Sequence, residues 1–412
     1  MIKKNILISA YACEPNKGSE PGVGWNWAIE LIRLGHNVKI ITRSNNQNSI
    51  NKLIKTEKRL KRNNFFYYDL PKFFLFFKNK IPFGVQIYYY LWQIFLYKNL
   101  KKQKFINNYQ IIHHLTLGSV RLPSFLWKLK KKFIFGPVGG FEFDKKTNIK
   151  KTFKFKDRLY EIFREKLTLF MINYNKDLKN CYKNSDLILS RNNLTKKNLQ
   201  NYFKKKILVS LDVASSDPIK TLNKKKESFK FLFVGRFYNF KGGDVLIDAF
   251  YKAIKKDPKL VLHFYGNGPE LKNWSKKITK LGLENNIKII GFIDKKKLNR
   301  IYQNYNVLIL PTFHDSGCSA IMEALSFSLP VICLNIGGPG DTIDKSCGIK
   351  ISINSKTSKN KIINQLSNSI IRIKYDKNFY KKLVNGAYNK AKSNTWSLLV
   401  KKTYSSILDY QK

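Results

Sequence analysis

The stretch of sequence that decides the fold runs from Ile301 to Asp344 and reads IYQNYNVLILPTFHDSGCSAIMEALSFSLPVICLNIGGPGDTID. Lys and Arg make up 77 of the 412 residues, so a window of this length is expected to hold roughly eight of them. It holds none. The pattern predicts, in order, a buried strand at 307–310, a loop at 311–318, a helix at 319–328 capped by Ser319, a strand at 331–334 and a glycine loop at 335–340. This order is typical of a βαβ unit in a parallel sheet.

Two acidic residues of this window lie where a ligand is expected. Asp315 falls in the first loop and Glu323 one turn into the helix, with seven residues between them. Ligands of open parallel sheets bind at the carboxyl ends of the strands, and the amides of a helix N-terminus favour phosphate. Carboxylates beside such a phosphate site suit the hydroxyls of a sugar. The alternative is a βαβ unit of the sheet core that carries a chance pair of acids.

The same residues resemble a known family. An acidic residue, seven residues, a Glu, a helix of small residues, Leu-Pro-Val-Ile and Gly-Gly are similar to the donor-site signature of family 4 glycosyltransferases of the GT-B fold, here from Asp315 to Gly338. The resemblance implies an α/β protein in which two doubly wound Rossmann-like parallel-sheet domains face each other across a cleft. It also implies that Asp315 contacts the donor sugar, Glu323 the ribose and the helix N-terminus at Ser319 a phosphate.

The loop between the two acidic residues departs from the family pattern. Asp315 stands where the family usually has Glu, and the residues after it replace the usual run of glycine and an aromatic residue. The sugar-binding loop implied here consists of Ser316, Gly317 and Cys318. These departures bear on which sugar is bound.

A second motif begins after the strand predicted at 229–234. Gly235-Arg-Phe-Tyr-Asn-Phe-Lys-Gly-Gly243 places Arg236 at the strand end and Lys241 just before a helix. A planar cation with two donors followed by an ammonium group suits a diphosphate. The segment also resembles the diphosphate clamp of the same family, and the alternative is a surface Arg and Lys. Phe292, which follows another predicted strand, resembles the family's nucleotide-base site or is an aromatic residue of the core.

The N-terminal segment predicts a related βαβ geometry. A strand at 5–10 is followed by a loop at 11–24 that contains Gly18, a helix at 25–34 and a strand at 38–42. The loop lacks a strict G-x-G-x-x-G, and by itself its glycines indicate only a tight turn. It resembles the N-terminal glycine loop of the same glycosyltransferases, whose amides approach the donor phosphates, and this assigns Gly18 to the diphosphate.

Two histidines end the strand predicted at 111–115. His113 and His114 lie at its carboxyl end, and successive residues of a strand point to opposite faces, so at most one of them is expected to point into the cleft. The family usually places a histidine near this point in contact with the donor sugar, but its second histidine lies one residue further along. Both residues therefore remain candidate catalytic groups, and we favour His114.

Residues 65–104 hold an aromatic concentration interrupted by lysines. Its uncharged run is too short for a membrane-spanning helix of ~20 residues. One interpretation is an amphipathic helix on an anionic membrane surface, with Tyr and Trp at the headgroups. The other is a buried helix with a basic exposed end.

The length and net charge of the chain limit its possible domain organisation and binding partners. The 412 residues predict two domains, here 1–211 for the acceptor and 228–394 for the nucleotide sugar, joined by a linker at 212–227 and followed by a helix at 395–412 that crosses back. The net charge of +50 suits nucleic acid or an anionic membrane, but the excess is shared almost evenly between both halves of the chain. The five cysteines show no C-x-x-C spacing, which fits reduced thiols, and no signal peptide is predicted, so we expect a cytoplasmic protein or one peripheral on the inner face of the cytoplasmic membrane.

These observations predict a glycosyltransferase that moves a sugar from a nucleotide diphosphate sugar to a glycan or lipid-linked acceptor, in envelope polysaccharide, lipopolysaccharide or glycolipid biosynthesis. The resemblance implies retention at the anomeric carbon. No D-x-D pair occurs in the sequence, so we expect cations of the protein rather than a metal to assist the leaving diphosphate, and no cofactor beyond the donor. Two alternatives remain: a catalytically silent GT-B protein that binds nucleotide sugar, and a basic nucleic-acid-binding protein.

Overall fold

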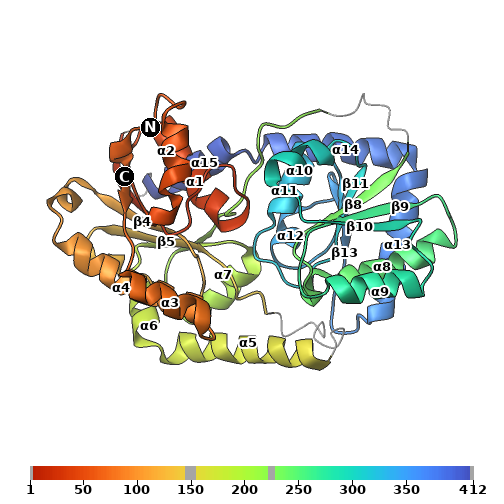
Figure 1. Ribbon diagram of the computed structural model, residues 1–412, viewed down its shortest axis with the longest axis horizontal. Coiled ribbons are helices and arrows are strands. Elements are labelled where there is room, and N and C mark those ends of the chain that lie inside the picture. The colour runs from red at the N-terminus through yellow and green to blue at the C-terminus, as the bar shows by residue number, and fades with distance from the viewer. Residues whose placement is uncertain (1–2, 144–154, 221–227, 409–412) are drawn as a thin grey trace. The chain divides into compact units, whose positions relative to one another are not determined.

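The computed structural model describes residues 3–143, 155–220 and 228–408, which form two compact units (Figure 1). The first unit comprises residues 1–141, 165–212 and 396–412, and the second comprises residues 142–164 and 213–395. Of the described residues, 142, 143 and 155–164 belong to the second unit, although they lie in the first half of the chain.

The first unit is built on a seven-stranded sheet whose neighbouring strands all run parallel. The strand order is β3-β2-β1-β4-β5-β6-β7. The strands are β1 (Asn5–Ala10), β2 (Asn37–Thr42), β3 (Phe65–Tyr67), β4 (Ile111–Thr116), β5 (Lys132–Val138), β6 (Leu187–Ser190) and β7 (Ile207–Val209). Every residue of β4 and β6 is buried, as expected for parallel strands covered on both faces.

Helices connect these strands, as parallel pairing requires. They are α1 (Ser19–Arg33), α2 (Gln47–Ile54), α3 (Lys72–Lys80), α4 (Gly84–Lys101), α5 (Phe155–Tyr174), α6 (Lys176–Lys183), α7 (Asn193–Gln200) and the C-terminal α15 (Trp396–Leu408). The two units divide α5 after Arg164, and α15 packs against α1 within the first unit.

The prediction that 11–24 forms a loop is wrong at its end, because α1 begins at Ser19. Pro21 lies in the first turn of the helix, where the missing N–H costs nothing. Position 24 lies inside the helix and requires a glycine, because a Cβ there would lie 2.1 Å from the Ala12 carbonyl oxygen. The glycines that indicate a loop in the sequence instead allow the helix to lie against the segment that follows β1.

The second unit is built on a six-stranded parallel sheet in the order β10-β9-β8-β11-β12-β13. The strands are β8 (Lys230–Val234), β9 (Val261–Tyr265), β10 (Ile287–Gly291), β11 (Val307–Leu310), β12 (Val331–Leu334) and β13 (Gly348–Ile351). All residues of β11 and β12 are buried. This burial explains why the window from Ile301 to Asp344 excludes Lys and Arg, since an unpaired buried cation is costly.

The helices of the second unit are α8 (Gly243–Ile254), α9 (Leu271–Lys280), α10 (Lys295–Tyr302), α11 (Ser319–Ser326), α12 (Gly337–Thr342), α13 (Lys359–Tyr375) and α14 (Lys377–Lys392). Two predictions here are wrong in detail. Cys318, not Ser319, is the N-cap of α11, and no side chain caps it. The segment predicted as a glycine loop forms the short α12, because its glycines allow close packing on the loop after β11. Both units are Rossmann-like, which confirms the predicted α/β class.

The aromatic region 65–104 begins with β3 and continues with two helices, α3 and α4, instead of one. Pro82 and Phe83 separate α3 from α4, and Phe83 adopts a left-handed conformation with a φ of 59°. Tyr88, Tyr89 and Trp92 of α4 are buried, whereas other aromatic residues of both helices are exposed. Within the described residues, no helix is long and apolar enough to cross a membrane.

Candidate donor site at the carboxyl edge of the second sheet

The segment predicted to bind a diphosphate follows β8 and turns sharply into α8. Arg236 is exposed, and its guanidinium carbon lies 5.6 Å from the centre of the Tyr238 ring. The next residue, Phe237, is fully buried, with its ring centre 4.8 Å from that of Trp274. This alternation anchors the segment in the core while its cation points to solvent.

Backbone contacts join this segment to the loop after β11. Gly242 has a φ of +75°, and a Cβ there would lie 2.1 Å from the carbonyl oxygen of Pro311. The amide of Phe313 donates to the carbonyl oxygen of Phe240 at 2.7 Å. The diphosphate segment and the sugar-binding loop predicted from the sequence therefore form one connected surface of the second unit.

The side chains at the centre of this surface form an ion pair. The ammonium nitrogen of Lys241 lies 2.5 Å from Oδ2 of Asp315, and both side chains are largely buried, at 17% and 16% exposure. Burial lowers the pKa of Lys241, but the negative charge of Asp315 outweighs burial and holds that pKa above its usual value. The pair places a cation and a carboxylate side by side, where a diphosphate and a sugar hydroxyl are predicted to bind.

Glu323 lies one turn into α11 and is held by two residues that the sequence did not indicate. Lys295 approaches Oε1 of Glu323 at 3.0 Å, and the hydroxyl of Tyr302 donates to Oε2 at 3.1 Å. Burial, together with the negative charge of Glu323, raises the pKa of Tyr302 well above its usual value. Tyr302 therefore stays protonated as a donor, and Glu323 accepts its hydrogen bond. No local sequence pattern identifies Lys295 or Tyr302 as partners of Glu323, because only the fold brings them next to it.

The predicted sugar-binding loop packs against the N-terminus of α12. The amide of Gly338 donates to the Asp315 carbonyl oxygen at 3.0 Å, and a Cβ on Gly338 would lie 2.4 Å from the carbonyl oxygen of Ser316. Gly317 also packs against the N-terminus of α12. Cys318 is buried, and burial raises the pKa of its thiol well above the usual range, so it is a neutral packing residue of this loop.

Two further predicted residues lie at the edges of the site. Ser319 is the first residue of α11, so its amide belongs to the helix N-terminus proposed for phosphate. Phe292 follows β10 and is 75% exposed. That exposure removes the alternative in which Phe292 packs in the core.

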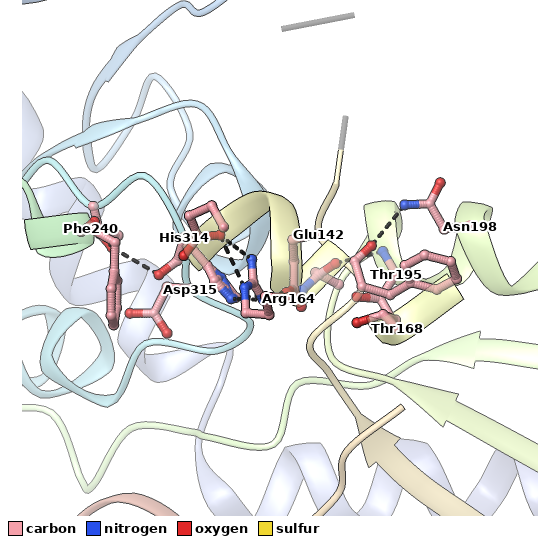
Figure 2. A network of polar contacts seen from close by, with 12 residues as sticks. Glu142, Arg164, Thr168, Thr195, Asn198, Phe240, His314 and Asp315 are labelled. Atoms are coloured by element: carbon pink, nitrogen blue, oxygen red, sulfur yellow. Dashed lines mark hydrogen bonds and ion pairs between the residues drawn. The ribbon is translucent and has the colours of Figure 1, made fainter. Parts of the chain in front are cut away.

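A cluster that the sequence did not predict surrounds His314 (Figure 2). Arg164 donates to Nε2 of His314 at 2.6 Å and makes an ion pair with Glu161 at 2.7 Å. The carboxylate of Glu142 is fully buried and lies 3.8 Å from the same Nε2. All four residues belong to the second unit, so Glu142 and Arg164 support the residue that directly precedes Asp315.

In the first unit, Gly18 directly precedes α1, with extended backbone angles. Beside it, Arg191 forms an ion pair with Glu20 and a second with Asp212 at 3.0 Å, and it donates to the carbonyl oxygen of Pro137 at 3.2 Å. Glu20 accepts from the amide of Leu117 at 3.1 Å. These contacts hold together the loops at the carboxyl ends of several strands, and no local sequence pattern predicts them.

The two histidines of β4 lie on opposite faces of the sheet, and both are fully buried. His113 is bonded at both ring nitrogens, to the Tyr404 hydroxyl and to the Gly136 carbonyl oxygen, each at 2.7 Å. Nε2 of His114 meets the Tyr89 hydroxyl at 2.9 Å, while its buried Nδ1 has no hydrogen-bond partner among the described residues. Burial lowers the pKa of His113 to about 4 and that of His114 to about 3, so both imidazoles are neutral at pH 7.

The structure thus brings Arg236, Lys241, Asp315, the 316–318 loop, Ser319 and Glu323 to one edge of the second sheet. Gly18 and the two histidines belong to the first unit. Among the residues that the structure describes, no group of three or more His, Cys, Asp or Glu side chains is arranged to hold a metal ion.

Comparisons with known proteins give similarities for the second unit and for the fold of the whole chain. Residues 216–390 match the family Glycosyl transferases group 1. Protein CapJ of Staphylococcus aureus is 27% identical over 172 residues, which cover 40% of this chain and 43% of CapJ. The chain spans less than half the length of the curated relatives that it matches.

Solved structures resemble the whole chain. Sucrose-phosphate synthase from Thermosynechococcus elongatus superimposes with a TM-score of 0.68 at 16% identity, over 99% of each chain. HepE from Anabaena, solved in complex with UDP, gives a TM-score of 0.62 at 13% identity, over 99% of this chain and 100% of HepE. These likenesses establish the α/β GT-B fold, with two Rossmann-like parallel-sheet domains. Together with the family match, they support the glycosyltransferase family.

Proposed function

We propose that this chain is a glycosyltransferase that moves a sugar from a nucleotide diphosphate sugar to a glycan or lipid-linked acceptor. The observation that carries this proposal is the ion pair between Lys241 and Asp315. It joins the segment suited to a diphosphate with the loop suited to a sugar, in the part of the chain that matches the glycosyltransferase family. Binding of UDP by HepE, which shares the fold, supports a nucleotide sugar as the donor.

The predicted site residues of the second unit each have a place on such a donor. Arg236 and Lys241 take the two phosphates, where charge-assisted hydrogen bonds to a cation are strong. Glu323, held by Lys295 and Tyr302, accepts from the ribose hydroxyls. Asp315 accepts from a hydroxyl of the sugar, and the exposed Phe292 stacks on the base. The N-terminus of α11 at Ser319 adds amide donors for a phosphate oxygen.

We propose that transfer proceeds with retention and without a metal ion. Arg236 and Lys241 offer positive charge where the diphosphate leaves, which is the role a divalent cation plays in other transferases. The absence of a D-x-D pair from the sequence supports this assignment. His114 is proposed as the histidine that contacts the sugar, since both ring nitrogens of His113 are already bonded within the protein.

The acceptor class proposed is a glycan or a lipid-linked sugar of envelope polysaccharide, lipopolysaccharide or glycolipid biosynthesis. The family resemblance and the basic character of the chain, with a net charge of +50, support an acceptor that is itself anionic or lies at an anionic surface.

A thermal-shift screen of nucleotide sugars against the purified chain tests the proposal. A donor present at 100 times its dissociation constant adds about 2.7 kcal/mol to the free energy of unfolding, which raises the melting temperature measurably. Stabilisation by one nucleotide and its sugar conjugate, followed by transfer to an acceptor extract, is the expected result. Stabilisation without turnover of any donor would identify a silent binding protein instead.

A further inference from the structure

The carboxyl ends of β1, β2 and β3 carry a group of aromatic and charged side chains to which the donor site gives no role. Tyr11 follows β1, Arg43 follows β2 and Asp69 lies two residues beyond β3, and these three strands are neighbours in the first sheet. Helices α3 and α4 add Lys78 and Tyr88 to the group (Figure 1). All five residues belong to the first unit, and ligands of open parallel sheets bind at this edge.

Two cations of this group lie against the same pair of tyrosine rings. The guanidinium carbon of Arg43 lies 5.1 Å from the centre of the Tyr11 ring and 5.3 Å from that of the Tyr88 ring. The ammonium nitrogen of Lys78 lies 6.0 Å and 5.2 Å from the same two centres. The face of an aromatic ring attracts a cation. Because both tyrosines are buried, their rings fix where the two positive charges lie.

The group contains one carboxylate, and both of its oxygens are already bonded. Asp69 accepts from Nε of Arg43 at 2.7 Å and from the amide of Ser44 at 2.8 Å. Within the described residues, no carboxylate comes close enough to Lys78 to form an ion pair. Burial and the positive charge of Arg43 lower the pKa of Lys78, and the negative charge of Asp69 offsets them only in part. Two cations and one carboxylate leave the group with a net positive charge.

The hydroxyl of Tyr11 supplies a neutral donor beside these charges. It is buried and makes no well-directed hydrogen bond with a described residue, although Arg43 lies beside it. Contacts with Tyr89 and Trp92, each with ring centres 5.1 Å apart, fix the Tyr11 ring. Burial raises the pKa of Tyr11 to about 12, so the hydroxyl stays protonated at pH 7. A buried donor without an acceptor is costly, and an anion bound beside Arg43 supplies that acceptor.

We propose that Arg43, Lys78 and the Tyr11 hydroxyl bind the anionic group, a carboxylate or a phosphate, of a sugar acceptor. Charge-assisted hydrogen bonds to such an anion satisfy Lys78 and the Tyr11 hydroxyl together. An ion pair that only holds the ends of β2 and β3 together explains Arg43 and Asp69, but it does not explain the second cation. The assignment of the ligand as an acceptor sugar rests on the proposed function, whereas the anion site itself rests on contacts within the first unit.

Ligand-observed NMR titration tests the site with glucuronate, glucose 6-phosphate and neutral glucose as probes. The wild type is expected to bind at least one of the two anionic sugars about tenfold more tightly than glucose, because a hydrogen bond to a charged group exceeds the 1.4 kcal/mol that a factor of ten requires. Lys78→Gln is expected to lose this preference. Lys72→Gln removes an exposed lysine of the same helix and is expected to keep it.

Three results of this titration overturn the proposal. The first is equal affinity of the wild type for all three sugars. The second is a preference for anionic sugars that Lys78→Gln retains in full. The third is an equal loss of preference in Lys78→Gln and Lys72→Gln, because the two variants have the same net charge and an equal loss means attraction by the charge of the whole chain.

Tyr11→Phe tests the hydroxyl without breaking a contact of the fold, because the described residues make no well-directed hydrogen bond with it. The melting temperature of this variant is expected to equal that of the wild type. Its affinity for the anionic sugar is expected to fall about fivefold, the value of a hydrogen bond of about 1 kcal/mol. Tyr160→Phe, which removes an exposed hydroxyl from α5, is the control. Unchanged affinity in Tyr11→Phe contradicts the proposed site.

Calorimetry with a nucleoside diphosphate on the wild type separates this inference from the proposed function. Binding of the diphosphate without a preference for either anionic sugar overturns the acceptor site alone. A preference for an anionic sugar that Lys78→Gln abolishes, without binding of the diphosphate, supports the anion site and contradicts the proposed transferase.

Discussion

The ammonium of Lys241 and the carboxylate of Asp315 are in contact at 2.5 Å, although each is proposed to bind a different part of the donor. A bound donor must therefore compete with this ion pair for both groups. A diphosphate competes with Asp315 for Lys241, and a sugar hydroxyl competes with Lys241 for Asp315. This pairing changes what substitutions at the two positions are expected to do.

Asp315→Asn is expected to lower turnover without weakening nucleoside diphosphate binding. The amide keeps the shape of the side chain but removes the charge that competes with the diphosphate for Lys241, while the contact to the sugar is weakened. Titration calorimetry gives the affinity, and a donor hydrolysis or transfer assay gives the turnover. Asp217→Asn, an exposed position away from the site, is the control. A large loss of diphosphate affinity in Asp315→Asn contradicts a sugar contact for Asp315.

Arg236→Ala and Lys241→Ala are each expected to weaken nucleoside diphosphate binding by roughly 1.5 to 3 kcal/mol, the value of a charge-assisted hydrogen bond. Calorimetry with the diphosphate measures the change, and Lys276→Ala on α9 controls for the loss of one positive charge. Unchanged affinity in both site variants removes these residues from the donor site. Lys241→Ala also leaves the largely buried Asp315 without its cation, so its thermal stability is to be measured alongside.

Glu323→Gln is expected to weaken binding of a nucleoside diphosphate but not of inorganic pyrophosphate. The carboxylate is oriented by Lys295 and Tyr302 to accept from the ribose hydroxyls, and pyrophosphate has no ribose. The expected loss is about 1 to 3 kcal/mol, typical of a hydrogen bond to a charged group. Competition between the two ligands, measured on wild type and variant, decides this. An equal loss for both ligands places Glu323 at the phosphates instead.

Transfer is expected to continue in the presence of EDTA and to retain the configuration of the anomeric carbon. Arg236 and Lys241 supply the positive charge that a metal ion would otherwise give the leaving group. NMR of the product linkage, with and without the chelator, tests both parts. Complete loss of activity that magnesium or manganese restores contradicts the role of the two cations, and an inverted product contradicts retention.

His113 and His114 are expected to make the chain less stable as the pH falls. Burial lowers the pKa of His113 to about 4 and that of His114 to about 3, whereas an unfolded histidine has a pKa of about 6.5. Below pH 6.5 the unfolded chain therefore binds protons that the folded chain does not, and the free energy of unfolding falls from there toward pH 4. Each pKa unit by which folding lowers a histidine contributes about 1.4 kcal/mol to the pH dependence of the free energy of unfolding. His113 and His114 together therefore contribute at least that much.

Urea unfolding at a series of pH values measures this effect, and His114→Gln is expected to show a shallower dependence than the wild type. NMR of the imidazole C–H signals gives an independent readout. The signals of His113 and His114 are expected to stay constant between pH 5.5 and 8, about where an exposed histidine titrates. Titration of either signal in that range contradicts the burial argument.

Local patterns in the sequence predicted most of the second unit. The strands at 307–310 and 331–334 are found with those bounds, because buried parallel strands require continuous apolar runs. Helix boundaries near glycine residues were harder to predict from the sequence. The glycines at 18, 22 and 24 indicate a loop, and only the close approach of α1 to the carbonyl oxygens of Lys17 and Ala12 shows why Gly22 and Gly24 lie in a helix.

The sequence by itself determined the α/β class, the positions of the strands, and the carboxyl-edge loops that hold Arg236, Lys241, Asp315 and Glu323. The tertiary structure alone decided which of these groups touch. Lys241 and Asp315 are 74 residues apart, and they meet only because β8 and β11 are neighbours in the sheet. The same holds for Glu323 on α11, whose partners Lys295 and Tyr302 lie on α10. Periodicity records which residues share a face, whereas the element that covers that face is set by strand order and packing, which no local pattern contains.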